Sequence, residues 1–367
     1  MSADSRLPQL PIIDVAGSHV EIGRAIGETL REGFQAVADN YRERLEASIG
    51  WHQAMAIARA LIPYAEANLP DCMDEIHGMA DGSCLEFSEI FSMNALQETI
   101  FLAQDEAGPS AQPTDSVEGC TSLAVTGEMS ENGHVLLGHN EDASPIRSAL
   151  PYVVRAKPDE GPAFVGFAYS TLLLYQGMNE CGIGSVGNAL YVRDMRSGTP
   201  KLLAYRDVLA SKYLEDAIRR THREHRANGN NHLLANEYGE IYDVEVSGRD
   251  SALFAPIDDY FVHTNHIRDP RLRSIESTDD VLNSTMRQTR VERRLNQMRG
   301  RLTVERVFEI LSDHSNYPRS VCKHYDEQHN QGSETVGSVV VDLTAGEIHV
   351  RAGHPCETTT TTIKLTA

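Results

Sequence analysis

The sequence predicts an α+β protein in which stacked antiparallel sheets are covered by helices. Its first long segment, residues 17–105, carries apolar residues at helical spacing. Many short strand-like segments follow from residue 121 onward without regularly alternating helices, which argues against a parallel sheet. Helical patterns return within that strand-rich part at about 201–227 and 285–313.

Two apolar stripes support the N-terminal helices. Their members are Val20, Ile22, Ala25, Ile26, Leu30 and Phe34, and then Met55, Ala58, Leu61, Ile62 and Ala65. Residues 74–100 predict two further helical pieces, broken near Gly82. Residues 106–118, EAGPSAQPTDSVE, are rich in Pro, Ser, Gly and acidic residues, so their composition indicates a linker.

The strands are predicted by short runs of β-branched and aromatic residues between turn residues. These runs are 121–125, 134–138, 152–156, 163–169, 172–178, 183–186, 232–236, 241–246, 252–256, 260–265, 336–343 and 347–353. No internal repeat is visible.

The charge balance narrows the classes of binding partner that we expect. The chain has 367 residues, with 53 acidic against 33 basic side chains and a net charge of −20. So acidic a surface repels phosphate backbones and anionic lipids, and we expect neither a nucleic-acid nor a membrane partner. The N-terminus has no signal-peptide pattern, and no apolar run reaches the roughly 18 residues of a membrane span. We expect a cytoplasmic protein.

The cysteines form no obvious framework. They are Cys72, Cys84, Cys120, Cys181, Cys322 and Cys356. None forms a CxxC pair, and their spacing predicts neither a zinc knuckle nor a set of disulfides. Most are therefore expected to be buried, unreactive thiols.

Cys120 differs because a strand begins directly after it, at the end of the linker. If its thiol attacks the carbonyl of Gly119, an N→S acyl shift gives a thioester that water can open. Gly119 suits this step because it lacks a Cβ and tolerates a strained turn. The new α-amine of Cys120 titrates at about pH 8 and can take the thiol proton. The junction therefore predicts self-cleavage and an N-terminal nucleophile; an ordinary buried thiol is the alternative.

Gly119-Cys120-Thr121-Ser122 resembles the cleavage site of the isopenicillin N acyltransferase (acyl-CoA:6-aminopenicillanic acid acyltransferase) family. That family is a branch of the N-terminal-nucleophile hydrolases related to bile-salt hydrolases and penicillin V amidases. The resemblance continues through VEIGRAIGE, MADGSCLEFSEIFSMNALQE, GHNED, GMNECGIGSVGNAL, HTNH, LSDHSNYPRSVCKH and GHPC. It implies a four-layer αββα sandwich of N-terminal-nucleophile hydrolase type. Residues 1–119 would be a helical pro-segment kept as a small subunit, and residues 120–367 the catalytic subunit.

The resemblance also implies roles for individual residues. Cys120 matches the nucleophile, and Asp142, in GHNED, matches the acid that holds the new ammonium group. Asn265, in HTNH, matches the asparagine that donates to the oxyanion. Asn188 lies where the related amidases place a second oxyanion contributor, and Arg287 where they carry an active-site arginine.

Each role has a structural alternative. Asp142 also suits a turn, Asn265 and Asn188 could be structural, and Arg287 could be a surface arginine on an arginine-rich helix. The sequence also departs from its relatives: Ala143 follows Asp142 where an aromatic residue is common, and His139 stands where bile-salt hydrolases keep an arginine. Both departures concern the acyl pocket.

The implied reaction is attack of the Cys120 thiolate on an amide, through a thioacyl-enzyme. We expect a hydrolase for a small linear amide, such as an N-acyl amino acid or an aminoacyl-amine. One alternative is an acyltransferase that moves an acyl group from a coenzyme A thioester or an amide to an amine. Another is an uncleaved, non-catalytic relative. We expect no cofactor and two subunits that stay associated; assembly into a homo-oligomer is left open.

Two other site types find weaker support. His263 and His266, together with His139 and Asp142, could be drawn as metal ligands, but their spacing fits no compact motif such as HExxH. We therefore expect no metal. Residues 182–187, GIGSVG, do not fit the GxGxxG dinucleotide motif, so these glycines are expected to allow close backbone packing in a sheet.

Overall fold

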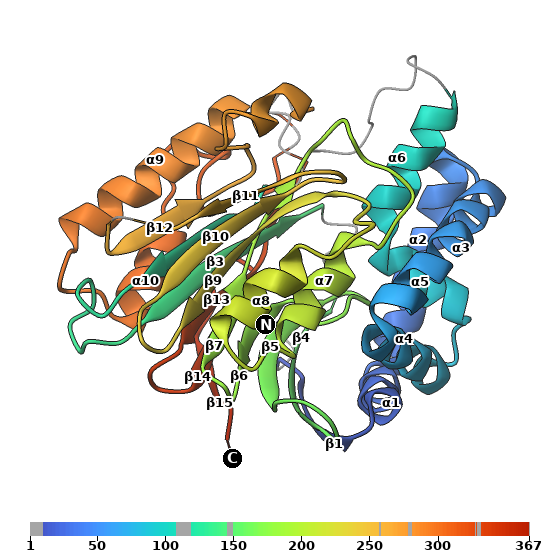
Figure 1. Ribbon diagram of the computed structural model, residues 1–367, viewed down its shortest axis with the longest axis horizontal. Helices are drawn as coiled ribbons and strands as arrows, with labels where there is room; N and C mark the ends of the chain where they lie inside the picture. The colour runs from blue at the N-terminus through green and yellow to red at the C-terminus, as the bar shows by residue number, and fades with distance from the viewer. Residues whose placement is uncertain are drawn as a thin grey trace, which may run out of the picture.

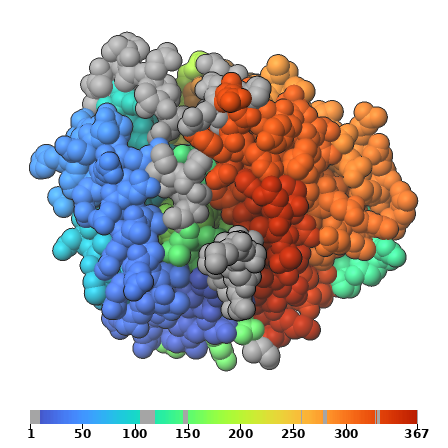
Figure 2. Space-filling model, turned by 180° about the vertical axis from the view of Figure 1, so that it is seen from behind, coloured from blue at the N-terminus to red at the C-terminus, as the bar shows by residue number. Residues whose placement is uncertain are grey.

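The computed structural model describes residues 10–107, 119–144, 150–256, 258–277, 281–326, 328 and 332–366. Two sheets lie face to face in the middle of the molecule, and helices cover the outer face of each (Figure 1). The N-terminal helices form one flank and the C-terminal segments the other (Figure 2). The four-layer αββα sandwich is thereby confirmed.

The elements follow one another along the chain as helices first and strands later. The helices are α1 (His19–Thr29), α2 (Arg31–Ser48), α3 (Trp51–Asn68), α4 (Pro70–Ser83), α5 (Phe87–Asn94), α6 (Leu96–Ala107), α7 (Lys201–Val208), α8 (Leu214–Thr221), α9 (Val281–Gln297) and α10 (Val304–Leu311), with a short 3-10 helix at Leu272–Ile275. The strands are β1 (Ile12–Gly17), β2 (Thr121–Val125), β3 (Leu136–Ala143), β4 (Pro151–Pro158), β5 (Phe164–Tyr169), β6 (Gln176–Asn179), β7 (Ile183–Val186), β8 (Ala189–Leu190), β9 (Gly229–Asn236), β10 (Ile241–Val246), β11 (Ser251–Phe254), β12 (Tyr260–His263), β13 (Glu334–Asp342), β14 (Glu347–Ala352) and β15 (Thr361–Lys364).

The larger sheet runs in the order β1-β4-β5-β6-β7-β9-β10-β11, with β8 paired to β9. Its pairs are antiparallel as predicted, except that β1 runs parallel to β4, with Ile12 opposite Val153. Parallel neighbours need a long crossover, and the helices α1 to α6 lie in the chain between β1 and β4. The N-terminal segment thus contributes an edge strand that its composition did not predict.

The smaller sheet runs in the order β12-β2-β3-β13-β14-β15. Strand β2 lies between β3 and β12, with Thr121 opposite Asn140 and Ser122 opposite His263. Cys120 directly precedes β2 and therefore lies beside both neighbouring strands. Helices α9 and α10 cover this sheet from outside through contacts with β12, β3 and β13.

Helix boundaries follow local chemistry. Helix α1 begins at Ser18, whose hydroxyl accepts from the Glu21 N–H while the Glu21 carboxylate accepts from the Ser18 N–H. The break predicted near Gly82 occurs instead at Cys84, which adopts φ 60° and ends α4. Gly82 lies inside the helix, and glycine suits this position because a Cβ there would stand 2.3 Å from the Arg24 carbonyl oxygen of α1.

The two later helical blocks are each divided. The block predicted at 201–227 contains α7 and α8. The block predicted at 285–313 contains α10 and most of α9, which begins earlier, at Val281. Gly300, with φ 71°, lies in the turn between α9 and α10. Of the linker predicted at 106–118, residues 108–118 lie outside the described residues. In the described ranges, none of the helices has the length and apolarity that a membrane crossing needs.

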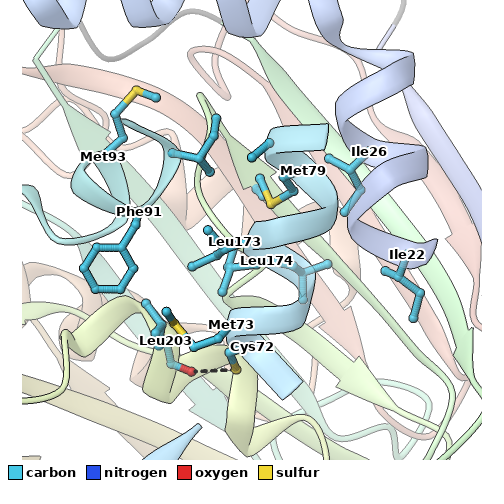
Figure 3. Packing of buried hydrophobic residues seen from close by; sticks show 14 of the residues in the cluster. Ile22, Ile26, Cys72, Met73, Met79, Phe91, Met93, Leu173, Leu174 and Leu203 are labelled. Carbon is cyan, nitrogen blue, oxygen red and sulfur yellow. Dashed lines mark hydrogen bonds between the residues drawn. The ribbon is translucent and has the colours of Figure 1, made fainter. Parts of the chain in front are cut away.

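A hydrophobic cluster joins the N-terminal helices to residues beyond the linker. Figure 3 shows side chains of α1 and α4 packed around Leu173 and Leu174, with Leu203 of α7 nearby. A buried ion pair adds to this contact: Arg206 of α7 lies 2.6 Å from Glu75 of α4, and each side chain is 3% exposed. The segment before residue 119 and the segment after it therefore share one core.

Candidate active site

Cys120 directly precedes strand β2, which lies next to the edge strand β12 of the smaller sheet, and is 4% exposed. Its Sγ donates a hydrogen bond to Glu141 Oε2 at 3.6 Å. Both residues line a pocket with an empty volume of about 490 Å³, counting the space open to solvent. The thiol predicted as nucleophile is thus buried by the surrounding chain yet faces a cavity.

The pocket combines aromatic, aliphatic and charged walls. Its lining residues are Asn94, Leu96, Gln97, Glu98, Cys120, Glu141, Tyr169, Leu172, Tyr175, Gly187, Ala189, Lys201, Leu202 and Tyr205. Tyr175 packs between Tyr169 and Tyr205, with ring centroids 6.2 and 5.9 Å away. Lys201 donates through its backbone N–H to the Glu98 carboxylate at 3.1 Å, and its ammonium donates to Gln97. One wall therefore carries an anionic and a cationic side chain close together.

Glu141 is a site residue that the sequence analysis missed. It stands on β3 beside the matched Asp142, on the face turned toward the other sheet, where Tyr169 donates to its Oε1 at 3.2 Å. His139, on the same face, lies 3.0 Å from Glu141 Oε2 through Nε2 and 2.8 Å from Ser122 Oγ through Nδ1. The twofold alternation of a strand was the available signal, because it places residues 139 and 141 on one face and residue 142 on the other.

Asp142 points to the opposite face of β3 and is fully buried. Its Oδ1 accepts from Thr335 Oγ1 at 2.7 Å, and its Oδ2 lies 3.7 Å from Lys323 Nζ. Within the described residues Oδ2 makes no hydrogen bond. Burial raises the pKa of Asp142 to about 6, against the opposing charges of Lys323 and Arg287. Oδ2 of Asp142 can therefore accept a hydrogen bond from a positively charged donor.

Gly119 is packed against positive charge. A Cβ on Gly119 would lie 2.0 Å from Lys323 Nζ and 3.3 Å from Arg287 Nη2. The absent side chain therefore leaves room for the Lys323 ammonium beside the Gly119–Cys120 peptide. Lys323 is 2% exposed and is a further site residue that sequence reasoning did not single out.

Arg287 lies at the centre of the predicted site. It is 3% exposed, so the surface alternative is wrong. Its Nη1 donates to the Cys120 carbonyl oxygen at 2.6 Å and to Thr121 Oγ1 at 2.9 Å. Its Nη2 donates to Asn265 Oδ1 at 2.8 Å, while Asn265 Nδ2 donates to the Ala189 carbonyl at 3.1 Å. The structure thus connects Cys120 to Asn265 through one guanidinium group.

Asn188 lies farther from the thiol in the hydrogen-bond network. Its Oδ1 accepts from Ser122 Oγ at 3.2 Å, and its Nδ2 donates to Asn231 Oδ1 at 2.8 Å. Its neighbours Gly187 and Ala189 line the pocket. Asn188 therefore borders the pocket through its backbone neighbours, and among the described residues a chain of hydrogen bonds through Ser122, His139 and Glu141 links its side chain to the Cys120 thiol.

The histidine set drawn from the sequence does not come together. His263 binds Glu245 at 2.8 Å and lies 3.8 Å from Asp243, and His266 binds Ser284 at 2.8 Å. Among the described residues, no cluster with metal-ligand spacing combines His263 or His266 with His139 or Asp142. His139 instead clusters with Cys120 and Glu141.

The sequence matches the model of one protein family and is similar to two named proteins. The model of the acyl-coenzyme A:6-aminopenicillanic acid acyl-transferase family matches residues 129–357. The acyl-coenzyme A:6-aminopenicillanic-acid-acyltransferase 40 kDa form of Emericella nidulans is 26% identical over 302 residues, which are 82% of this chain and 80% of that protein. The β-alanyl-dopamine/carcinine hydrolase of Drosophila melanogaster is 24% identical over 239 residues, 60% of this chain and 59% of that protein.

Two solved structures resemble the fold. Penicillin V acylase from Agrobacterium tumefaciens gives a TM-score of 0.48 at 14% identity, covering 67% of this chain and 86% of that one. A mutant of conjugated bile acid hydrolase from Clostridium perfringens gives 0.44 at 13% identity, covering 67% and 96%.

Proposed function

Because the chain belongs to the acyl-coenzyme A:6-aminopenicillanic acid acyl-transferase family, we propose that it is a self-processing cysteine amidohydrolase with Cys120 as its nucleophile. The observation that carries the proposal is the position of the thiol. Its Sγ faces a pocket and a carboxylate, while the carbonyl of the same residue is held by Arg287. Asp142, Asn265, Asn188 and Glu141 complete the proposed site.

The first proposed step is cleavage of the Gly119–Cys120 peptide. Cys120 has no free amine before cleavage, so another base must accept the thiol proton, and Glu141 is hydrogen-bonded to Sγ. The thiolate attacks the Gly119 carbonyl carbon, the C–N bond breaks, and the amine leaves with a proton. Water then opens the thioester and releases the Gly119 carboxylate. Lys323 and Arg287 place positive charge beside Gly119, which would favour the oxyanion of the intermediate.

The second proposed role belongs to the new α-amine of Cys120. It can take the thiol proton during turnover and return it to the leaving amine of the substrate. Asp142 supports this role because its buried Oδ2 makes no hydrogen bond within the described residues and can accept one from the ammonium group. Asn265 Nδ2 has two N–H donors, one of which binds the Ala189 carbonyl. The other is the proposed oxyanion donor, a role typically worth about 10² to 10³ in rate.

The proposed substrate is a small linear amide of the N-acyl amino acid or aminoacyl-amine type. The pocket supports this because tyrosines can enclose an aromatic or aliphatic group, while Lys201 and Glu98 can bind a carboxylate or an amine. The Drosophila relative is named as a hydrolase of such amides, β-alanyl-dopamine and carcinine. The reaction ends with water attacking the thioacyl-enzyme.

Acyl transfer is the second candidate, supported by the name of the Emericella relative. In that case an amine instead of water accepts the acyl group, and a coenzyme A thioester can replace the amide as donor. We further propose that both segments stay associated after cleavage, because β1 pairs with β4 and the N-terminal helices share the core with Leu173 and Leu174 (Figure 3).

The test combines intact mass with a substrate panel. Wild type, Cys120→Ala and the control Cys181→Ala, which alters an exposed thiol, are purified and weighed. Wild type and the control should split between Gly119 and Cys120 and hydrolyse acyl-amides, while Cys120→Ala should stay whole and inactive. A panel with and without coenzyme A thioesters and amine acceptors separates hydrolysis from transfer. A single uncut wild-type chain without activity would instead support a non-catalytic relative.

A further inference from the structure

Two cysteines and two histidines converge away from the pocket, at the loop that follows α10 and the turn that follows β14. His314, Cys322 and His324 come from the loop, and Cys356 comes from the turn. Each offers one ligand atom, and these atoms all lie within 4.8 Å of one another. Nothing in the proposed reaction uses these side chains.

The distances within this group match one shared ion. The two sulfur atoms, of Cys322 and Cys356, are 3.7 Å apart. His324 Nε2 lies 3.6 Å from Cys322 Sγ and 3.5 Å from Cys356 Sγ. His314 Nε2 lies 3.2 Å from His324 Nε2.

A tetrahedral zinc ion gives nearly the same edges. With Zn–S bonds of about 2.3 Å and Zn–N bonds of about 2.05 Å, ligand atoms stand about 3.8 Å apart for two sulfurs. The corresponding spacing is about 3.6 Å for sulfur and nitrogen and about 3.3 Å for two nitrogens. Two cysteines and two histidines are also a ligand set that structural zinc sites use. We propose that His314, Cys322, His324 and Cys356 bind a zinc ion.

The surroundings suit a structural ion. Cys322 is fully buried, whereas His314 and Cys356 lie at the surface, so an ion can enter from solvent. The ring of His354 packs against His324, with centroids 4.0 Å apart, and its Nε2 lies 3.2 Å from a carboxylate oxygen of Glu334. Such outer contacts orient ligands. Because the protein supplies all four ligands, no position is left for a substrate.

A disulfide between Cys322 and Cys356 is the competing explanation. A disulfide would need the two sulfur atoms to be about 2.05 Å apart. It would also not explain why both histidines lie near the sulfurs. Zinc accounts for all four side chains. Its binding replaces the proton of each thiol, and both thiols then serve as thiolate ligands.

The position of the ion also explains how Lys323 is held. Lys323 lies between the ligands Cys322 and His324 in the sequence and contacts Asp142 beside Gly119. An ion bound on both sides of Lys323 fixes the backbone that carries it. The zinc is therefore a positioning element for this loop and takes no part in bond breaking.

The test measures metal in the full chain, purified under reducing conditions and incubated with zinc. Wild type and the control Cys181→Ser should keep about one zinc per chain after dialysis. Cys356→Ser, a change in an exposed turn, and His314→Ala should lose most of it. Cobalt added to the metal-free wild type should give thiolate-to-cobalt charge-transfer bands and intense visible bands of a tetrahedral ion, which Cys356→Ser abolishes. A chelator should lower the Tm of wild type and leave that of Cys356→Ser unchanged.

Three results would overturn the proposal. They are a wild type that retains no zinc, a Cys356→Ser variant with full metal content, and a Cys322–Cys356 disulfide found by peptide mapping of the protein purified with reductant. None of these readouts depends on whether Cys120 is a nucleophile.

Discussion

Replacing the buried Asp142 by asparagine should change how stability depends on pH. In the folded protein burial raises the pKa of Asp142 from 3.8 to about 6, while Lys323 and Arg287 act in the opposite direction. The folded state therefore holds the carboxyl proton more tightly than the unfolded chain does. Asp142 favours folding when protonated, and this contribution is lost as the pH rises from about 4 to about 6.

The magnitude of this pH dependence follows from the pKa shift of Asp142. A difference of about 2 pKa units, at about 1.4 kcal/mol per unit, corresponds to about 3 kcal/mol of unfolding free energy. The asparagine side chain introduced by Asp142→Asn cannot ionise but can still accept from Thr335 Oγ1. The stability of this variant relative to the parent should therefore rise by about 2 kcal/mol between pH 4 and pH 6, out of about 3 kcal/mol over the whole titration, and level off above pH 7.

The comparison is made in a Cys120→Ala background, so that every molecule is one chain. Urea unfolding at four pH values between 4 and 7 gives the free energy of unfolding for the parent, for Asp142→Asn and for Asp159→Asn, whose carboxylate is exposed. Asp159→Asn should follow the parent at every pH. The reasoning would be refuted if the stability of Asp142→Asn relative to the parent did not change with pH, or fell as pH rises. That result would show that the charges of Lys323 and Arg287 outweigh burial.

Three further outcomes are expected. Glu141→Gln removes the proposed proton acceptor and should slow self-cleavage by about 10² to 10⁴, measured by intact mass over time; an unchanged rate would remove Glu141 from the mechanism. Gly119→Ala forces the Lys323 ammonium away from the peptide and should slow the same cleavage by about 10²-fold; a rate equal to that of wild type would contradict a role for the Lys323 charge at this peptide. Arg206→Met leaves the buried Glu75 with His19, at 2.8 Å, in place of its arginine partner, and should lower the unfolding free energy of Cys120→Ala protein by about 3 kcal/mol in urea, the lower end of the range for a broken buried pair; adding Glu75→Gln should recover part of that loss, and a loss below about 1 kcal/mol would contradict the pair's role.

Local patterns predicted much of the fold. Most strands from β2 onward were found because their residues are β-branched or aromatic and end at turn residues, whereas β8 and β15 were not predicted. Strand β1 was not predicted, because its partner β4 lies beyond the whole helical segment. The helix break was displaced from Gly82 to Cys84 because the glycine serves contact with α1, which no local pattern reveals.

The site residues show the same contrast between what local patterns reveal and what depends on contacts across the fold. Motif order singled out Asp142 and drew attention away from Glu141, although the alternation of β3 turns Glu141 toward the Cys120 thiol and Asp142 toward Lys323 beside Gly119. Lys323 was invisible because its role depends on a contact with Gly119 across the fold. The ligand group containing Cys322 was missed for a related reason: its members are unevenly spaced, and Cys356 arrives from another element.

The pocket is built from both sides of the Gly119–Cys120 junction. Asn94, Leu96, Gln97 and Glu98 come from the segment before it, whereas the thiol and its carboxylate come from the segment after it. One part of the pocket wall is thereby encoded in a stretch of sequence separate from the proposed reacting atoms. A chimaera that carries α5 and α6 of a relative would inherit a different selectivity wall around an unchanged reaction centre, so evolution can retune the choice of substrate by altering a region that holds no reacting atom.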